Sequence, residues 1–69
     1  MAELVAITLN GERRNVPPGS VGDLIRSLAR DPRTVAVERN GEILSRDRYD
    51  ATLLTAGDRL EIVHFVQGG

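Results

Sequence analysis

Apolar residues occupy every second position over residues 5–9, which is the period of a β-strand with one buried face. Asn10-Gly11 follows directly. This pair is typical of a tight hairpin turn, because both central residues of a type I′ turn need a positive φ. We therefore expect residues 12–16 to fold back as an antiparallel strand, which Pro17-Pro18 ends.

A helical period begins after Ser20, with an apolar stripe formed by Val21, Leu24, Ile25 and Leu28. Ser20 is placed to cap this helix, and Asp23 completes a short capping box. Asp31-Pro32 is expected to close the helix.

The second half of the chain repeats the strand pattern. Residues 35–38 alternate, and Asn40-Gly41 predicts a second hairpin that leads to Ile43 and Leu44. Residues 45–50 are polar and predict an irregular or short 3₁₀ crossing, with Tyr49 against the edge of the core.

Residues 59–66 form the longest β-rich run and predict a strand with two distinct faces. Leu60 and Ile62 are expected to be buried on one face, and the other face carries Glu61, Val63 and Phe65. We expect residues 67–69 to form a flexible tail, because nothing apolar anchors them.

This order of elements predicts a two-layer α+β domain that spans residues 1–69. An opening hairpin, one main helix across the sheet and a last strand that returns beside the first form a β-grasp arrangement. The mixed sheet should contain about five strands.

Composition excludes several classes of function. The chain has 69 residues, no Cys and one His, which leaves no disulfide, no thiolate metal site and no metal cluster. Its formal net charge of -1 lacks the basic excess that nucleic-acid binding requires. No apolar run approaches the roughly 20 residues that cross a bilayer. The expectation is a cytoplasmic protein without a membrane or nucleic-acid partner.

No catalytic constellation is present among the reactive side chains. His64 lacks a partner and is typical of a packing or surface residue. Ser20 is better explained as a helix cap than as a nucleophile, and Asp47 and Asp50 stand in a charge-balanced loop. We therefore do not expect an enzyme, a metal site or a bound cofactor.

The chain's final residues, Gly68 and Gly69, suggest chemistry at the α-carboxylate. Without Cβ atoms they can enter a narrow channel in another protein and present that carboxylate to a reactive centre. Adenylation by an ATP-using partner would turn it into an acyl electrophile. The alternative is an ordinary frayed terminus.

Val63 and Phe65 form a second candidate feature. Exposed apolar residues on a strand that leads into such a tail favour a partner surface on so small a chain. The alternative is partial cover by Tyr49 or Ile43.

The chain resembles the ThiS family of sulfur carriers in thiamin biosynthesis, which have the ubiquitin-like β-grasp fold. The resemblance covers essentially all of the chain and is carried by the segments Leu9-Asn10-Gly11-Glu12, Ser20-Val21-x-x-Leu24-Ile25, Val35-Ala36-Val37-Glu38-Arg39-Asn40-Gly41-Glu42-Ile43, Gly57-Asp58-Arg59-Leu60-Glu61-Ile62-Val63 and Gly68-Gly69.

The resemblance implies a role for each site residue. Gly69 would bear the adenylate and then the thiocarboxylate, Gly68 would provide clearance, and the docking face would comprise Val63, Phe65 and Glu61. The implied partners are a ThiF-like adenylyltransferase of the ubiquitin-activating type that uses ATP, a sulfur-donating enzyme and a ThiG-like thiazole synthase. Alternatives are a MoaD-like small subunit of molybdopterin synthase, a β-grasp interaction module with an inert tail, and a ubiquitin-like modifier, since fold alone does not separate them.

Overall fold

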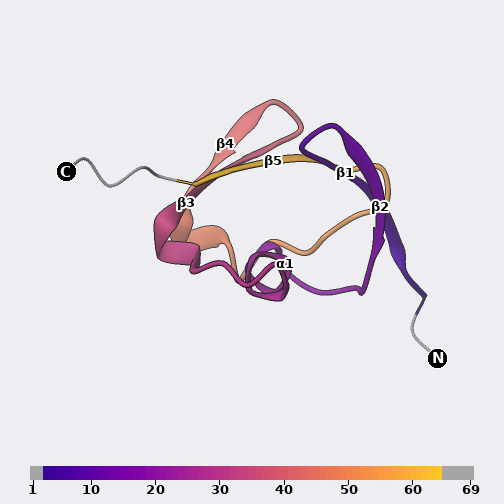
Figure 1. The fold of residues 1–69 in the computed structure, drawn as a ribbon, viewed down its shortest axis with the longest axis horizontal. Coiled ribbons are helices and arrows are strands. Elements are labelled where there is room, and N and C mark those ends of the chain that lie inside the picture. Colours follow the sequence, from indigo (N-terminus) through magenta and orange to yellow (C-terminus); the bar gives the residue numbers. More distant parts are fainter. Residues whose placement is uncertain (1–2, 65–69) are drawn as a thin grey trace.

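The computed structural model describes residues 3–64 of the chain. The elements in chain order are β1 (Val5–Leu9), β2 (Glu12–Val16), α1 (Val21–Ser27), the 3₁₀ turn η1 (Pro32–Thr34), β3 (Val35–Arg39), β4 (Glu42–Leu44), the 3₁₀ turn η2 (Arg46–Arg48) and β5 (Arg59–His64). The strands form one five-stranded sheet in the order β2-β1-β5-β3-β4 (Figure 1).

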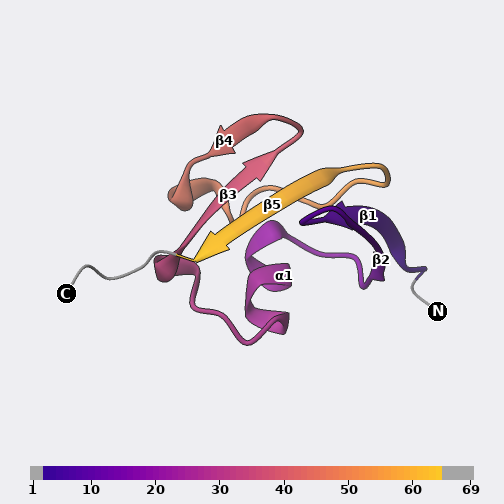
Figure 2. The ribbon, with the colours of Figure 1, turned by 45° about the horizontal axis from the view of Figure 1, so that its top comes forward.

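The last strand occupies the centre of the sheet. β5 runs parallel to β1, with Leu9 opposite Leu60, and antiparallel to β3, with Val37 opposite Ile62. α1 packs across one face of this sheet, below β5 in Figure 2. The parallel contact and the single crossing helix confirm the predicted β-grasp arrangement.

The core lies between α1 and the sheet. Strand positions two apart share a face, so the inward residues of β1, β3 and β5 meet the helix stripe. The buried apolar residues are Ile7, Leu9, Val16, Val21, Leu24, Ile25, Val35, Val37, Tyr49, Leu60 and Ile62. Leu28 and Leu54 pack against this cluster and are partly buried.

The capping box at the start of α1 is confirmed. The Asp23 N–H donates to Ser20 Oγ and the Ser20 N–H donates to Asp23 Oδ2, each at 3.0 Å. These bonds satisfy backbone groups that the first helical turn leaves free, so Ser20 serves as the helix cap.

The end of α1 differs from the sequence-based prediction. The helix stops at Ser27, well before Asp31-Pro32. Ala29 adopts a left-handed φ of 60°, and the Ala29 and Arg30 N–H groups donate to the carbonyls of Arg26 and Ile25. This Schellman-type end usually uses Gly, so the sequence carried no signal for it. Pro32 instead begins η1, which Asp31 caps.

Tyr49 lies inside the core and not at its edge, where we expected it. Its side chain is buried, and its hydroxyl donates to the Val35 carbonyl at 3.1 Å. The predicted 3₁₀ crossing before it is confirmed as η2.

Candidate functional site

The structure describes some of the predicted site residues and not others. Phe65, Gly68 and Gly69 lie outside the described residues. Glu61 and Val63 lie on β5 and are exposed. Leu60 and Ile62, which alternate with them along the strand, are buried. The predicted two-faced strand is therefore confirmed as far as His64.

Glu61 and Val63 belong to the sheet face that points away from α1, which we call the outer face. Side chains alternate along a strand and cross-strand partners share a face. The register therefore assigns ten residues to the outer face, namely Ala6, Thr8, Arg13, Asn15, Ala36, Glu38, Ile43, Arg59, Glu61 and Val63.

The apolar part of the outer face is open. Val63 is 60% exposed and Ile43 is 82% exposed. Tyr49 lies in the core. The alternative was partial cover of Val63 and Phe65 by Tyr49 or Ile43; most of the Val63 side chain is exposed, and Phe65 lies outside the described residues.

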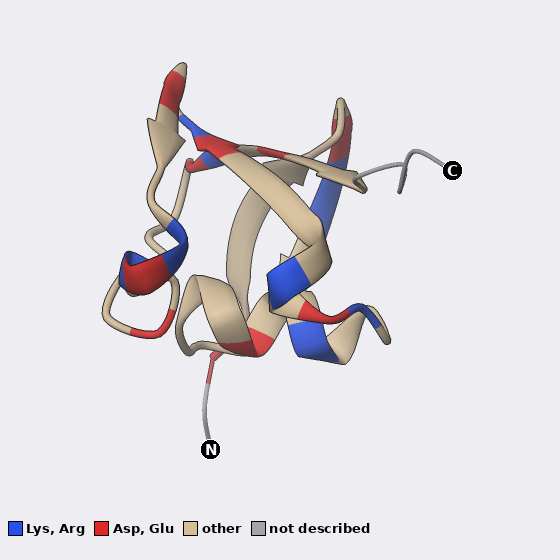
Figure 3. Cartoon of the chain, turned by 90° about the vertical axis from the view of Figure 1, so that its left-hand side faces the viewer, with Lys and Arg blue, Asp and Glu red and all other residues tan. Residues whose placement is uncertain are grey.

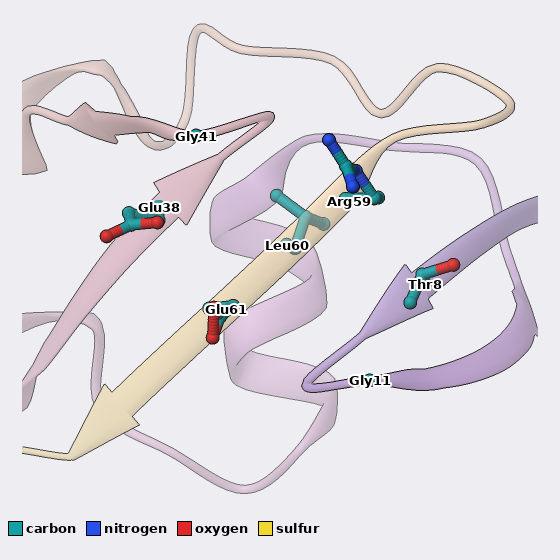
Figure 4. A pocket seen from close by; sticks show the side chains of 7 residues that line it. All are labelled: Thr8, Gly11, Glu38, Gly41, Arg59, Leu60 and Glu61. Atoms are coloured by element: carbon teal, nitrogen blue, oxygen red, sulfur yellow. The ribbon is translucent and has the colours of Figure 1, made fainter.

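Two shallow hollows lie along β5 on the outer face. The first, of about 340 Å³, is lined by Thr8, Gly11, Glu38, Gly41, Arg59, Leu60 and Glu61. Figure 4 shows it over the first half of β5, between the two hairpin turns. The second, of about 180 Å³, is lined by Ala36, Val37, Glu38, Ile43, Glu61 and Val63. Glu38 and Glu61 line both hollows.

The two turn asparagines hydrogen-bond the backbone of β5, Asn40 at its first residue and Asn10 at Ile62. Asn10 Nδ2 donates to the Ile62 carbonyl at 3.2 Å, and its Oδ1 accepts from the Ile62 N–H at 2.8 Å. On the opposite edge, Asn40 Oδ1 accepts from the Arg59 N–H at 2.8 Å. Both asparagines were interpreted from sequence only as hairpin signals. The presence of Asn at both turns could have indicated these bonds to β5, because the Asn side-chain amide offers both a donor and an acceptor.

Asp58 joins this network just before β5. Its side chain is buried, and it accepts hydrogen bonds of 2.8 to 3.1 Å from the Thr55 N–H, Asn40 Nδ2 and Arg39 Nε. Burial raises the pKa of the Asp58 carboxyl, but these donors together outweigh that effect and leave its pKa below the ordinary value. The carboxylate therefore stays ionised and supports the turn that starts β5.

The remaining reactive side chains of the described residues do not gather into a metal-binding cluster. No group of three or more His, Asp or Glu side chains that could hold a metal ion occurs within residues 3–64. His64 is exposed at the end of β5, with its Nε2 3.3 Å from Thr34 Oγ1.

Basic and acidic segments are interspersed in Figure 3 and do not form one basic face. No helix in this part of the chain is long and apolar enough to span a bilayer.

Curated relatives of two kinds are similar to this chain. A thiazole synthase of Magnetococcus marinus is 44% identical over 64 residues, which cover 91% of this chain and 20% of that protein. The sulfur carrier protein ThiS of Bacillus subtilis is 45% identical over 51 residues, which cover 74% of this chain and 77% of that one. This chain thus spans about a fifth of the synthase and most of the carrier.

A solved structure and a family model agree with these relatives. The crystal structure of the thiamine biosynthesis protein ThiS from Geobacter metallireducens superposes with a TM-score of 0.79 at 35% identity. The superposition covers 94% of this chain and all of that one. The model of the ThiS family matches residues 7–69. The β-grasp fold, the relatives and this match together show that the chain belongs to the ThiS family.

Proposed function

We propose that this chain is a sulfur carrier of thiamin biosynthesis that works through the carboxylate of Gly69. The observation that carries the proposal is the ThiS family match, which extends through residue 69 and thus includes Gly68 and Gly69. The open outer face supports it, because β5 carries Glu61 and Val63 and leads along the chain into these glycines.

The proposed chemistry needs no catalytic group from this chain. A Gly69 carboxylate oxygen attacks the α-phosphorus of ATP, the bond to the β,γ-phosphates breaks, and pyrophosphate leaves. Hydrosulfide (HS⁻) released by a sulfur-donating enzyme then attacks the acyl carbon and displaces AMP, so that a C–S bond replaces the C–O bond to AMP and a thiocarboxylate remains. ATP is bound by the activating partner, so the carrier acts as a co-substrate and not as an enzyme.

The proposed partners are a ThiF-like adenylyltransferase and a ThiG-like thiazole synthase that takes the sulfur. The names of the relatives from Magnetococcus marinus and Paramagnetospirillum magneticum support the synthase, since a segment similar to this chain forms part of each. Val63, Phe65 and Glu61 would form the docking face for these partners in the cytoplasm. Gly68 would pass through the partner's channel without a Cβ atom to obstruct it.

Mass spectrometry of the protein isolated from its host tests this function. We expect a C-terminus in which one oxygen of the Gly69 carboxylate is replaced by sulfur. An isopeptide bond to another protein would identify a modifier, and an unmodified terminus would identify an interaction module; either outcome would overturn the proposal. Sulfur delivered to molybdopterin synthase and not to thiazole synthase would instead favour the MoaD-like role.

A further inference from the structure

Both hairpin turns contain the dipeptide Asn-Gly, in which the Asn side chain loses ammonia more readily than it does before other residues. The two sites are Asn10-Gly11 and Asn40-Gly41. The glycine backbone nitrogen attacks the Asn amide carbon, the amide C–N bond breaks, and ammonia leaves with the glycine N–H proton. Water then opens the cyclic succinimide to Asp or isoaspartate. Glycine favours this attack because no Cβ shields its nitrogen, and both asparagines are exposed to water.

Hydrogen bonds to β5 and to the turn before it oppose this reaction while the domain is folded. The Asn10 side chain makes two bonds to the Ile62 backbone, of 2.8 and 3.2 Å. The Asn40 side chain accepts from the Arg59 N–H at 2.8 Å and donates from Nδ2 to Asp58 Oδ1 at 3.1 Å. The bond from Nδ2 must break before that nitrogen leaves as ammonia, and the bond to Oδ1 restrains the amide from turning toward the glycine. Deamidation at either turn therefore requires local opening beside β5.

The two asparagines differ in the group that Nδ2 contacts. Asn10 Nδ2 donates to a neutral backbone carbonyl, whereas Asn40 Nδ2 donates to the carboxylate of Asp58, which is only 4% exposed. Deamidation exchanges this NH₂ group for a negatively charged oxygen. At residue 40 the product sets a second carboxylate against Asp58, and like charges repel more strongly in a partly buried site than in water. Arg39 already donates to Asp58, so its single charge offsets only one of the two carboxylates.

We propose that Asn40 is a site of spontaneous modification at which loss of ammonia weakens the fold, while the same reaction at Asn10 is tolerated. Opening of the contact between Asn40 and Asp58 permits the reaction. The product repels Asp58, so the contact does not form again, and the start of β5 loses its support on that side. The reaction consumes only water and limits how long the chain stays folded. This inference is independent of the proposed function.

Peptide mapping by mass spectrometry tests the protection of the two sites. The wild-type chain is incubated at neutral pH, folded in buffer and unfolded in urea, and then digested with trypsin. Cleavage after Arg39 places the two sites on different peptides. We expect both sites to lose ammonia in urea, and Asn40 to react at least about tenfold more slowly in the folded chain. Equal rates at Asn40 in buffer and in urea would overturn the inference.

Thermal melts of two variants test the consequence of the reaction. Asn40→Asp reproduces the product, and Asn10→Asp is the matched control, with the same change of charge at the same position of the other turn. We expect Asn40→Asp to melt at least about 5 °C below Asn10→Asp. In an Asp58→Asn background the repulsion is absent, so Asn40→Asp should lower the melting temperature much less there. An Asn40→Asp chain that melts at or above Asn10→Asp, or an equal loss in both backgrounds, would overturn the inference.

Discussion

Asn10 and Asn40 each connect a hairpin turn to β5 through a side-chain amide. Both have positive φ, of 49° and 54°, so Gly can replace either without straining the turn. Asn10→Gly keeps the hairpin but leaves the Ile62 backbone N–H and C=O without the amide. We expect a loss of about 1 to 3 kcal/mol, which denaturant unfolding measures. An unchanged midpoint would show that these bonds contribute nothing to stability.

The Asp58 carboxylate predicts how stability depends on pH. Its pKa lies below the unfolded value of about 3.9, so its contribution is complete above that value and is lost as the pH falls through the folded pKa. Unfolding free energy should therefore fall as the pH is lowered below about 5, and fall less in Asp58→Asn. Hydrogen bonds from Arg33 lower the pKa of Asp31 to about 2, so part of the dependence remains. Equal slopes for both proteins would contradict this assignment.

At the scale of elements, β5 alternates buried side chains, which stabilise the core, with exposed ones, which we propose bind a partner. Ile62 is buried, and its truncation to Ala should cost about 2 to 5 kcal/mol. A domain of this size has only about 3 to 5 kcal/mol in total, so the variant should be largely unfolded. Circular dichroism and a thermal melt measure this loss.

Val63→Asp is the complementary change on the same strand. Because Val63 is 60% exposed, the new carboxylate stays in water in the free protein, and the melt should lie within a few degrees of wild type. Binding to the activating enzyme should fail, since that carboxylate would be desolvated at an apolar contact. Phe65→Asp should behave alike, and this remains a prediction. Unfolding of Val63→Asp with a stable Ile62→Ala would contradict the assignment of the two faces.

For the whole molecule, the domain and the tail should be separable in experiment. Deleting Gly69, or adding one residue after it, removes or displaces the carboxylate that we propose to react, and changes none of the residues that make the described contacts. ATP–pyrophosphate exchange should be abolished while circular dichroism is unchanged. Gly68→Val should have the same effect, because the branched valine side chain would obstruct the channel of the activating partner that we propose Gly68 enters. Exchange at the wild-type rate by the deletion variant would contradict the carrier mechanism.

The candidate site was only partly predictable. Val63 and Glu61 were assigned to an exposed face from the period of the last strand alone, and their exposure confirms it. Ile43 and Glu38 were not assigned to that site, because they come from β3 and β4 and reach it only through strand pairing. The roles of Gly68, Gly69 and Phe65 remain predictions.

Local sequence patterns alone predicted the order of elements, the capping box and the burial of Leu60 and Ile62 on the last strand. These follow from signals within a few residues, namely the periods of strand and helix and the two Asn-Gly turns. Only the tertiary structure decided that the turn asparagines hold β5, that Asp58 is buried among donors, and that Glu38 faces Glu61. Apart from the Thr55 bond to Asp58, those contacts join residues 18 to 52 positions apart. A local sequence pattern does not indicate which distant backbone group or charged side chain will lie opposite a given residue.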